Sequence, residues 1–95
     1  MIIGVAQLEL FLPECRSLKE KRQIIKSIID RIRGKYSVSM AEIDNHGLWQ
    51  RATLGIACVS LSDYQAQRVL SDIERCVENL NKATVLSHKV TLLSP

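Results

Sequence analysis

The sequence is poor in the features that mark secreted and membrane proteins. Its three cysteines show no CxxC spacing, and no apolar run approaches the roughly 18 residues that cross a bilayer. The opening segment contains Gln7 and Glu9 and lacks the basic region of a signal peptide. These absences predict a cytoplasmic protein with reduced thiols, and they argue against a disulfide framework, a zinc site, a signal peptide and a membrane helix.

Motifs that hold phosphates or present a nucleophile are missing as well. The chain has four glycines in 95 residues and contains no GxGxxG sequence, no P-loop and no nucleophile elbow. These motifs bind nucleotide phosphates through the backbone or expose a catalytic serine. Their absence argues against the nucleotide-binding and serine-hydrolase classes.

The chain does contain enough apolar material for a core, together with one strongly basic segment. Leu, Ile, Val and Phe occupy 30 of the 95 positions, above the ~20% below which chains tend to stay disordered, so residues 1–95 are expected to form one small globular domain. Residues 16–35 contain eight basic and two acidic side chains, a formal charge of +6, whereas the rest of the chain carries −3. This asymmetry favours a polyanionic partner.

Alternation and helical periodicity predict six elements. In order they are a strand, a helix, two strands, a helix and a strand, over residues 2–12, 17–34, 36–44, 52–61, 62–81 and 84–92. Ser17 with Glu20, and Ser62 with Gln65, have the spacing of capping boxes that open the two helices. Gly34 is expected to end the first helix.

This order predicts an α+β fold, the ferredoxin-like βαββαβ sandwich, with a four-stranded antiparallel sheet and two helices on one face. Gly4 and Ala6 suit close approach of a helix to the first strand, which is predicted to be central. The opposite face stays open and carries Ile3, Val5 and Phe11. Because an uncovered apolar sheet face indicates a partner, we expect a homodimer.

Three motifs occur in order along the chain. They are Arg-Ser-Leu-Lys-Glu-Lys-Arg at 16–22, Ala-Glu-Ile-Asp at 41–44, and Leu-Trp-Gln-Arg-Ala at 48–52 leading to Leu54-Gly55. With these motifs, essentially the whole chain resembles the bacterial YlxP-like family, a domain of unknown function. The resemblance implies a ferredoxin-like fold and a cytosolic bacterial protein, often encoded near translation factors and ribosome-binding factor A. It implies no activity.

The basic helix gives the strongest functional signal. Cations collect on one flank of the helix, away from its isoleucine stripe, and just before its start: Arg16, Lys19, Arg22, Lys26 and Arg33. Such a stripe suits a phosphate backbone, to which cations bind with release of counterions. The alternative is an ordinary solvated helix face that Glu20 and Asp30 partly neutralise.

Trp49 and Arg51 lie beside the predicted turn at 45–47. An indole next to a guanidinium can stack an unpaired RNA base. The alternative is that Trp49 packs against neighbouring strands or a second subunit. The candidate RNA site therefore consists of the five cations of the basic segment together with Trp49 and Arg51.

Other side chains give weaker signals. Glu42, Asp44 and His46 lie near the turn and His88 in the last strand, but no HxH or HExxH spacing exists, so neither a metal nor a cofactor is expected. The acids are expected to pair with the basic helix or Arg51, and His88 to be a half-exposed sheet residue. Cys15 has no neighbouring base, which predicts a surface thiol without function whose replacement by serine leaves folding intact.

These observations lead to one hypothesis and two alternatives. The leading hypothesis is a non-enzymatic module that binds ribosomal RNA or a ribosome assembly intermediate through the basic helix. The alternative is a protein-interaction or small-molecule-binding module that uses the open sheet face or the Trp49 hairpin. The third is an acylphosphatase-like hydrolase, suggested by Arg16 in the loop before the first helix, although that loop is not glycine-rich.

Overall fold

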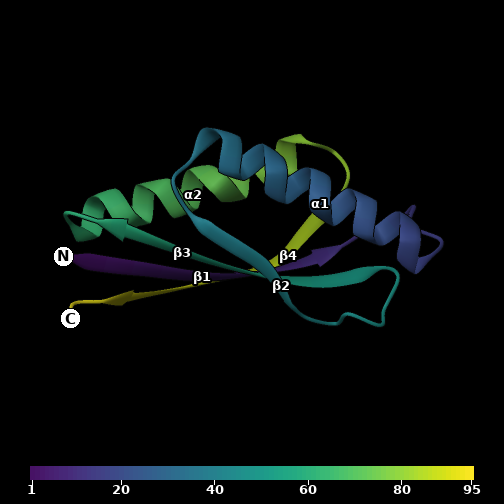
Figure 1. Cartoon of the computed structure of the whole chain (residues 1–95), viewed down its shortest axis with the longest axis horizontal. Helices are drawn as coiled ribbons and strands as arrows, with labels where there is room; N and C mark the ends of the chain where they lie inside the picture. Colours follow the sequence, from purple (N-terminus) through teal and green to yellow (C-terminus); the bar gives the residue numbers. More distant parts are fainter.

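The computed structural model describes residues 1–95 as six elements in the order predicted from the sequence. They are β1 (Ile2–Phe11), α1 (Leu18–Lys35), β2 (Ser39–Asp44), β3 (Arg51–Ser60), α2 (Asp63–Asn79) and β4 (Thr84–Leu93). The strands form one antiparallel sheet in the order β2-β3-β1-β4, with β1 and β3 central. Both helices cover the same face of this sheet (Figure 1), which confirms the predicted ferredoxin-like fold.

Each helix begins at the serine that the sequence indicated. Ser17 Oγ accepts a hydrogen bond from the Glu20 amide at 3.1 Å, and Ser62 Oγ accepts one from the Gln65 amide at 3.2 Å. These bonds satisfy amide groups that have no partner inside the first turn. The prediction that Gly34 ends α1 is wrong by one residue, because the helix continues to Lys35 before turning into β2.

The core lies between the helices and the sheet. It contains Ala6, Leu8 and Leu10 of β1 together with buried isoleucines of α1 and the apolar stripe of α2. At Gly4 a Cβ atom would lie 3.1 Å from both Leu70 Cδ1 and Cys58 Sγ, so a larger residue would push α2 away from the sheet. The predicted close approach at this position is confirmed.

Cys15 corrects the sequence interpretation. Its side chain is 1% exposed and belongs to the core, and its Sγ donates to the Ser17 carbonyl oxygen at 3.4 Å. The loop between β1 and α1 passes from the sheet layer to the helix layer, and this path carries the thiol inward. The prediction of a surface thiol is therefore wrong, and a serine at this position would bring a more polar hydroxyl into the core.

The other sheet face has no helix over it (Figure 1). The register places Ile3 of β1 between Val59 of β3 and Leu93 of β4, which makes an apolar row across three strands. Val59 is 70% exposed and Leu93 is 48% exposed, whereas Ile3 is half-buried between them. Neither helix is both long and apolar enough to cross a lipid bilayer.

Candidate nucleic-acid interface

Four of the predicted cations share one side of α1, and we call this set the basic flank: Lys19, Arg22, Lys26 and Arg33. All four are exposed, whereas the residues that face the sheet are buried. Arg33 Nη2 donates to the Met40 carbonyl oxygen at 3.1 Å, which places the flank along the edge strand β2. At a rise of about 1.5 Å per residue, the flank extends roughly 21 Å along the helix.

The charges of the basic flank differ in how far they are already neutralised. Lys26 Nζ lies 3.0 Å from Asp30 Oδ2, and both side chains are more than half exposed. Such an exposed pair contributes little to stability and can exchange for another anion. Lys19 and Arg22 form no ion pair, and neither does Arg16 in the preceding loop. The side chains of these three cations have no partner, whereas Arg33, which also forms no ion pair, donates to the Met40 carbonyl oxygen.

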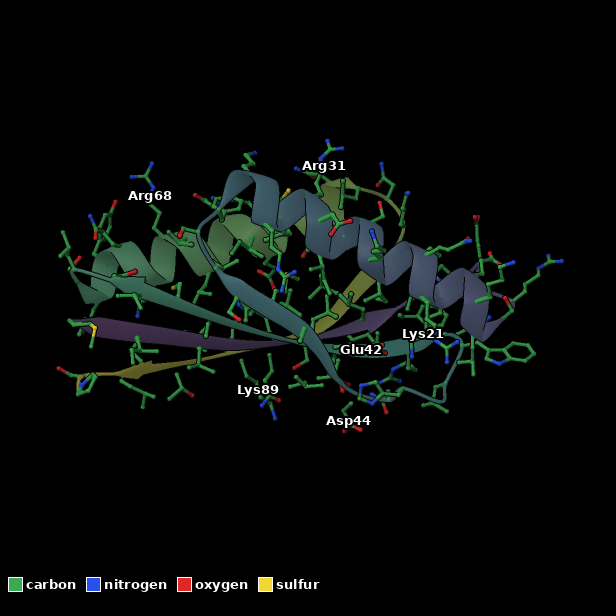
Figure 2. The ribbon with its side chains drawn as sticks, viewed as in Figure 1. Lys21, Arg31, Glu42, Asp44, Arg68 and Lys89 are labelled. Carbon is green, nitrogen blue, oxygen red and sulfur yellow. The ribbon has the colours of Figure 1, made fainter.

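The expected pairing of Glu42 with the basic helix is confirmed through Lys21, whose burial sequence reasoning missed. Lys21 is 1% exposed, and its Nζ lies 2.8 Å from Glu42 Oε2 and 2.6 Å from the Asn45 carbonyl oxygen that accepts its hydrogen bond. Figure 2 shows Lys21 of α1 and Glu42 of β2 lying together between helix and sheet. A signal for this burial existed, because Lys21 has helical spacing with the buried Ile25, Ile28 and Ile32.

Residues 45–50 form the turn between β2 and β3, which we call the Trp49 loop. Its backbone is tied to the loop that precedes α1: the Leu12 amide donates to the Gln50 carbonyl oxygen at 2.9 Å, and Gln50 Nε2 donates to the carbonyl oxygens of Pro13 and Cys15 at 3.3 Å. The structure thus brings the Trp49 loop beside the loop that carries Arg16, although 33 residues separate Arg16 and Trp49 in the chain.

At its base the Trp49 loop is held from both sides. Asn45 adopts a left-handed conformation with φ of 63°, accepts from Lys21 through its carbonyl oxygen, and donates through Nδ2 to Thr53 Oγ1 at 2.9 Å. Asparagine tolerates this backbone region better than most residues. The buried Lys21 therefore helps to position the loop that presents Trp49.

Trp49 lies at the surface. Its side chain is 53% exposed, next to Leu48 at 51%, and the indole nitrogen donates to no group of the chain. About half of Trp49 is thus covered by its own chain, and the other half is open to solvent or to a second subunit. An exposed indole on an anchored loop is available to a base or to another protein surface.

Arg51 has a different environment from the basic flank. It begins β3, and its Nη2 lies 2.8 Å from Glu9 Oε2, while Thr53 Oγ1 donates to Glu9 Oε1 at 3.0 Å. The hydrogen bond from Thr53, followed by that from Arg51, holds the pKa of Glu9 below its ordinary value of 4.5. Arg51 thus pairs with Glu9 and not with Glu42 or Asp44, the acids expected from the sequence.

The remaining acids and histidines are dispersed. Asp44 accepts a hydrogen bond from the Asn45 amide at 2.7 Å, and Figure 2 shows its side chain on the opposite side of the sheet from the helices. His46 Nε2 lies 3.1 Å from the Glu42 carbonyl oxygen. His88 is largely buried against α2, with Nδ1 3.1 Å from Glu74 Oε2. Nowhere do three His, Cys, Asp or Glu side chains come together.

Comparison with known sequences and structures gives a consistent result. A family model described as "Protein of unknown function (DUF503)" matches residues 3–90. The "Uncharacterized protein YlxP" of Bacillus subtilis (strain 168) is 40% identical over 72 residues, which cover 76% of this chain and 78% of that protein. The predicted resemblance to the YlxP-like family is confirmed.

Similar solved structures support the fold alone. A de novo designed protein with ferredoxin fold has a TM-score of 0.59 at 15% identity, with 100% of this chain and 88% of that chain covered. A dimeric ferredoxin-like protein from an uncultured marine organism has a TM-score of 0.52 at 10% identity, with 100% and 98% covered.

Proposed function

The chain belongs to the DUF503 family of proteins of unknown function, and we propose that it is a non-enzymatic module that binds structured RNA. The observation that carries the proposal is that the Trp49 loop is anchored at the N-terminal end of α1, the end at which Lys19 and Arg22 of the exposed basic flank lie. Phosphates bind the cations of α1, and Trp49 stacks on an unpaired base at the end of the same surface.

The charge distribution supports a phosphate backbone as the ligand of the basic flank. Lys19 and Arg22 are exposed and unpaired, and Lys26 has only an exposed partner. Because this surface is a stripe along a helix and not a pocket, it suits an extended polyanion better than a small anion. Most of the binding free energy is then electrostatic and insensitive to sequence.

Ribosomal RNA, or a ribosome assembly intermediate, is the target that the proposal names. The choice rests on the YlxP-like resemblance, which implies genes near translation factors and ribosome-binding factor A. A cytoplasmic location follows from the same choice of partner.

Co-sedimentation with purified ribosomal subunits tests this proposal. At low salt the protein is expected in the subunit pellet, and raising the salt several-fold releases it. The double variant Lys19→Glu/Arg22→Glu is expected to stay in the supernatant. The matched control is Lys82→Glu/Lys89→Glu, which changes the net charge equally at two exposed lysines outside α1. Equal loss of binding in both variants, or in neither, contradicts a role for the basic flank.

The open sheet face favours self-association as a second property. The apolar row of Val59, Ile3 and Leu93 crosses three strands without a helix over it. A second copy of the chain that packs against this row would remove it from water. The similar marine protein is described as dimeric, which fits an arrangement of this kind.

Sedimentation velocity at micromolar concentration checks this second property. A dimer is expected for the unmodified chain and a monomer for Val59→Glu, because the carboxylate would be buried in the interface. Leu48→Glu, in the Trp49 loop, is expected to remain dimeric. A monomeric unmodified chain, or dissociation by Leu48→Glu alone, rules out the sheet face as the interface.

A further inference from the structure

A cavity of about 990 Å³ lies at the end of the molecule away from the Trp49 loop. It is bounded by the last turn of α1, the first turns of α2 and the segment that joins β3 to α2. Its inner wall includes the buried Cys58 and the half-buried Val69. The volume falls within the range of about 300–1,000 Å³ that is typical of sites for small molecules.

The charge around this cavity has one sign. None of its 13 lining residues is acidic, whereas Lys35 and Arg68 both contribute to it. Neither cation takes part in an ion pair or donates a side-chain hydrogen bond. Arg68 lines the cavity from α2 and is exposed, and Figure 2 shows its side chain pointing away from the sheet. An anion bound in this cavity would therefore have two cations available that lack an acidic partner.

Aromatic and apolar groups complete the cavity. Tyr36 is half-buried, with Lys35 Nζ 5.7 Å from the centroid of its ring, and Tyr64 on α2 is 70% exposed. Leu61 is 87% exposed on the same wall. Tyrosine faces of this kind stack on flat rings, and exposed apolar groups gain free energy when a ligand covers them.

We infer that this cavity binds a small phosphate ester with a flat ring, the chemical class that includes nucleoside monophosphates. Arg68 and Lys35 bind the phosphate, and the ring lies against Tyr64. The serine hydroxyls at 37 and 60 supply further donors at the wall. Because the chain has no glycine-rich phosphate loop, the phosphate is held by side chains and not by backbone amides.

This site is separate from the proposed RNA surface. The basic flank begins at Lys19 in the first turn of α1, whereas the cavity uses Lys35 at the end of that helix. No residue of the basic flank or of the Trp49 loop lines the cavity. The two sites can therefore be tested independently.

Titration of the isotope-labelled protein, followed by amide chemical shifts, tests the inference with three probes: adenosine monophosphate, adenosine and inorganic phosphate. Adenosine monophosphate is expected to shift amides around residues 35–37 and 59–68 with saturation. Adenosine and phosphate are expected to bind the same amides at least about tenfold more weakly, because each lacks half of the recognised groups.

Arg68→Gln is the decisive variant and Arg31→Gln its matched control. Both arginines are exposed on helices and point away from the sheet (Figure 2), but Arg31 does not line the cavity. Arg68→Gln is expected to weaken the binding of adenosine monophosphate about tenfold or more, whereas Arg31→Gln is expected to leave this binding unchanged. Unshifted amides elsewhere in the spectrum show that each variant is folded.

Three outcomes would overturn the inference: no saturable shift around the cavity at millimolar adenosine monophosphate, equal weakening by both arginine variants, or shifts confined to the basic flank. The charge-reversed Lys19→Glu/Arg22→Glu protein separates the two proposals. Retained nucleotide binding in that variant supports the cavity whether or not RNA binding is lost, and loss of nucleotide binding there contradicts it.

Discussion

Two groups of cations on α1 behave in opposite ways. Lys21 is buried beneath the helix, paired with Glu42 and bonded to the Asn45 carbonyl oxygen, whereas Lys19 and Arg22 on the neighbouring flank are exposed and unpaired. All three count equally in the charge of +6 carried by residues 16–35. Their position around the helix decides which charge contributes to the fold and which is available to a ligand.

Charge counted along the sequence therefore overestimates the charge that is available to a ligand at the protein surface. Lys21 is already neutralised, and Arg33 bonds to the Met40 carbonyl oxygen of β2. Of the α1 cations that stay exposed and unpaired, Lys19 and Arg22 lie at the N-terminal end, where the Trp49 loop is anchored, and Arg31 and Lys35 lie towards the C-terminal end. The buried lysine is therefore connected to the proposed function indirectly, because it positions that loop.

The largest loss of folding stability is expected from replacing Lys21. Lys21→Met is expected to lower the free energy of unfolding by about 3 kcal/mol, because it leaves Glu42 charged and largely buried without its partner. Urea denaturation at neutral pH measures this change. The double variant Lys21→Met/Glu42→Leu should recover most of the loss, and a double variant as unstable as Lys21→Met would contradict the pairing as the cause.

Reversing the charge of the exposed cations should impair RNA binding and not folding stability. Lys19→Glu/Arg22→Glu is expected to weaken binding to structured RNA about a hundredfold and to leave the urea midpoint nearly unchanged, because both side chains are solvated in the free protein. For the unmodified chain, about five phosphate contacts predict a slope of log affinity against log salt of roughly −3.5 to −4.5. A slope that does not become shallower in the double variant would show that these cations do not contact phosphates.

Trp49→Ala tests whether the indole beside the basic flank contributes to RNA binding or to stability. Stacking predicts a loss of about 1–3 kcal/mol in RNA affinity. Stability should change little, because the side chain is 53% exposed. Fluorescence anisotropy with labelled RNA and a urea titration of the same variant separate the two effects. A large loss of stability with unchanged RNA affinity would assign Trp49 a structural role.

The smallest effect on stability is expected from replacing Glu9, which lies on the open sheet face. Its pKa is lowered by the hydrogen bonds from Thr53 and Arg51, so its stabilising contribution is present above the unfolded value of 4.5 and is lost as pH falls through the lower folded value. Glu9→Gln should therefore lose less stability than the unmodified chain between neutral pH and pH values below 4.5. Thermal denaturation across that range measures the difference, and parallel curves would refute it.

Much of the fold could be predicted because its signals are local. The alternating first strand, the two serine caps and the apolar stripes of both helices lie within single elements, and each appears in the structure near its predicted bounds. Helical spacing alone likewise places the cations of the basic flank on one side of α1. Gly4 indicates the close approach of a helix to the first strand because it has no side chain, and in the structure a Cβ atom there would lie 3.1 Å from Leu70 Cδ1 of α2.

The sequence by itself determined the order of elements, the cover of one sheet face and the grouping of the exposed cations, all of which follow from periodicity over a few residues. Only the tertiary structure decided that Lys21 and Cys15 are buried, that Arg51 pairs with Glu9, and that Gln50 ties the Trp49 loop to the loop before α1. The physical reason is that these contacts join elements far apart in the chain. Whether a charge or a thiol meets water or a partner there depends on which element packs above it.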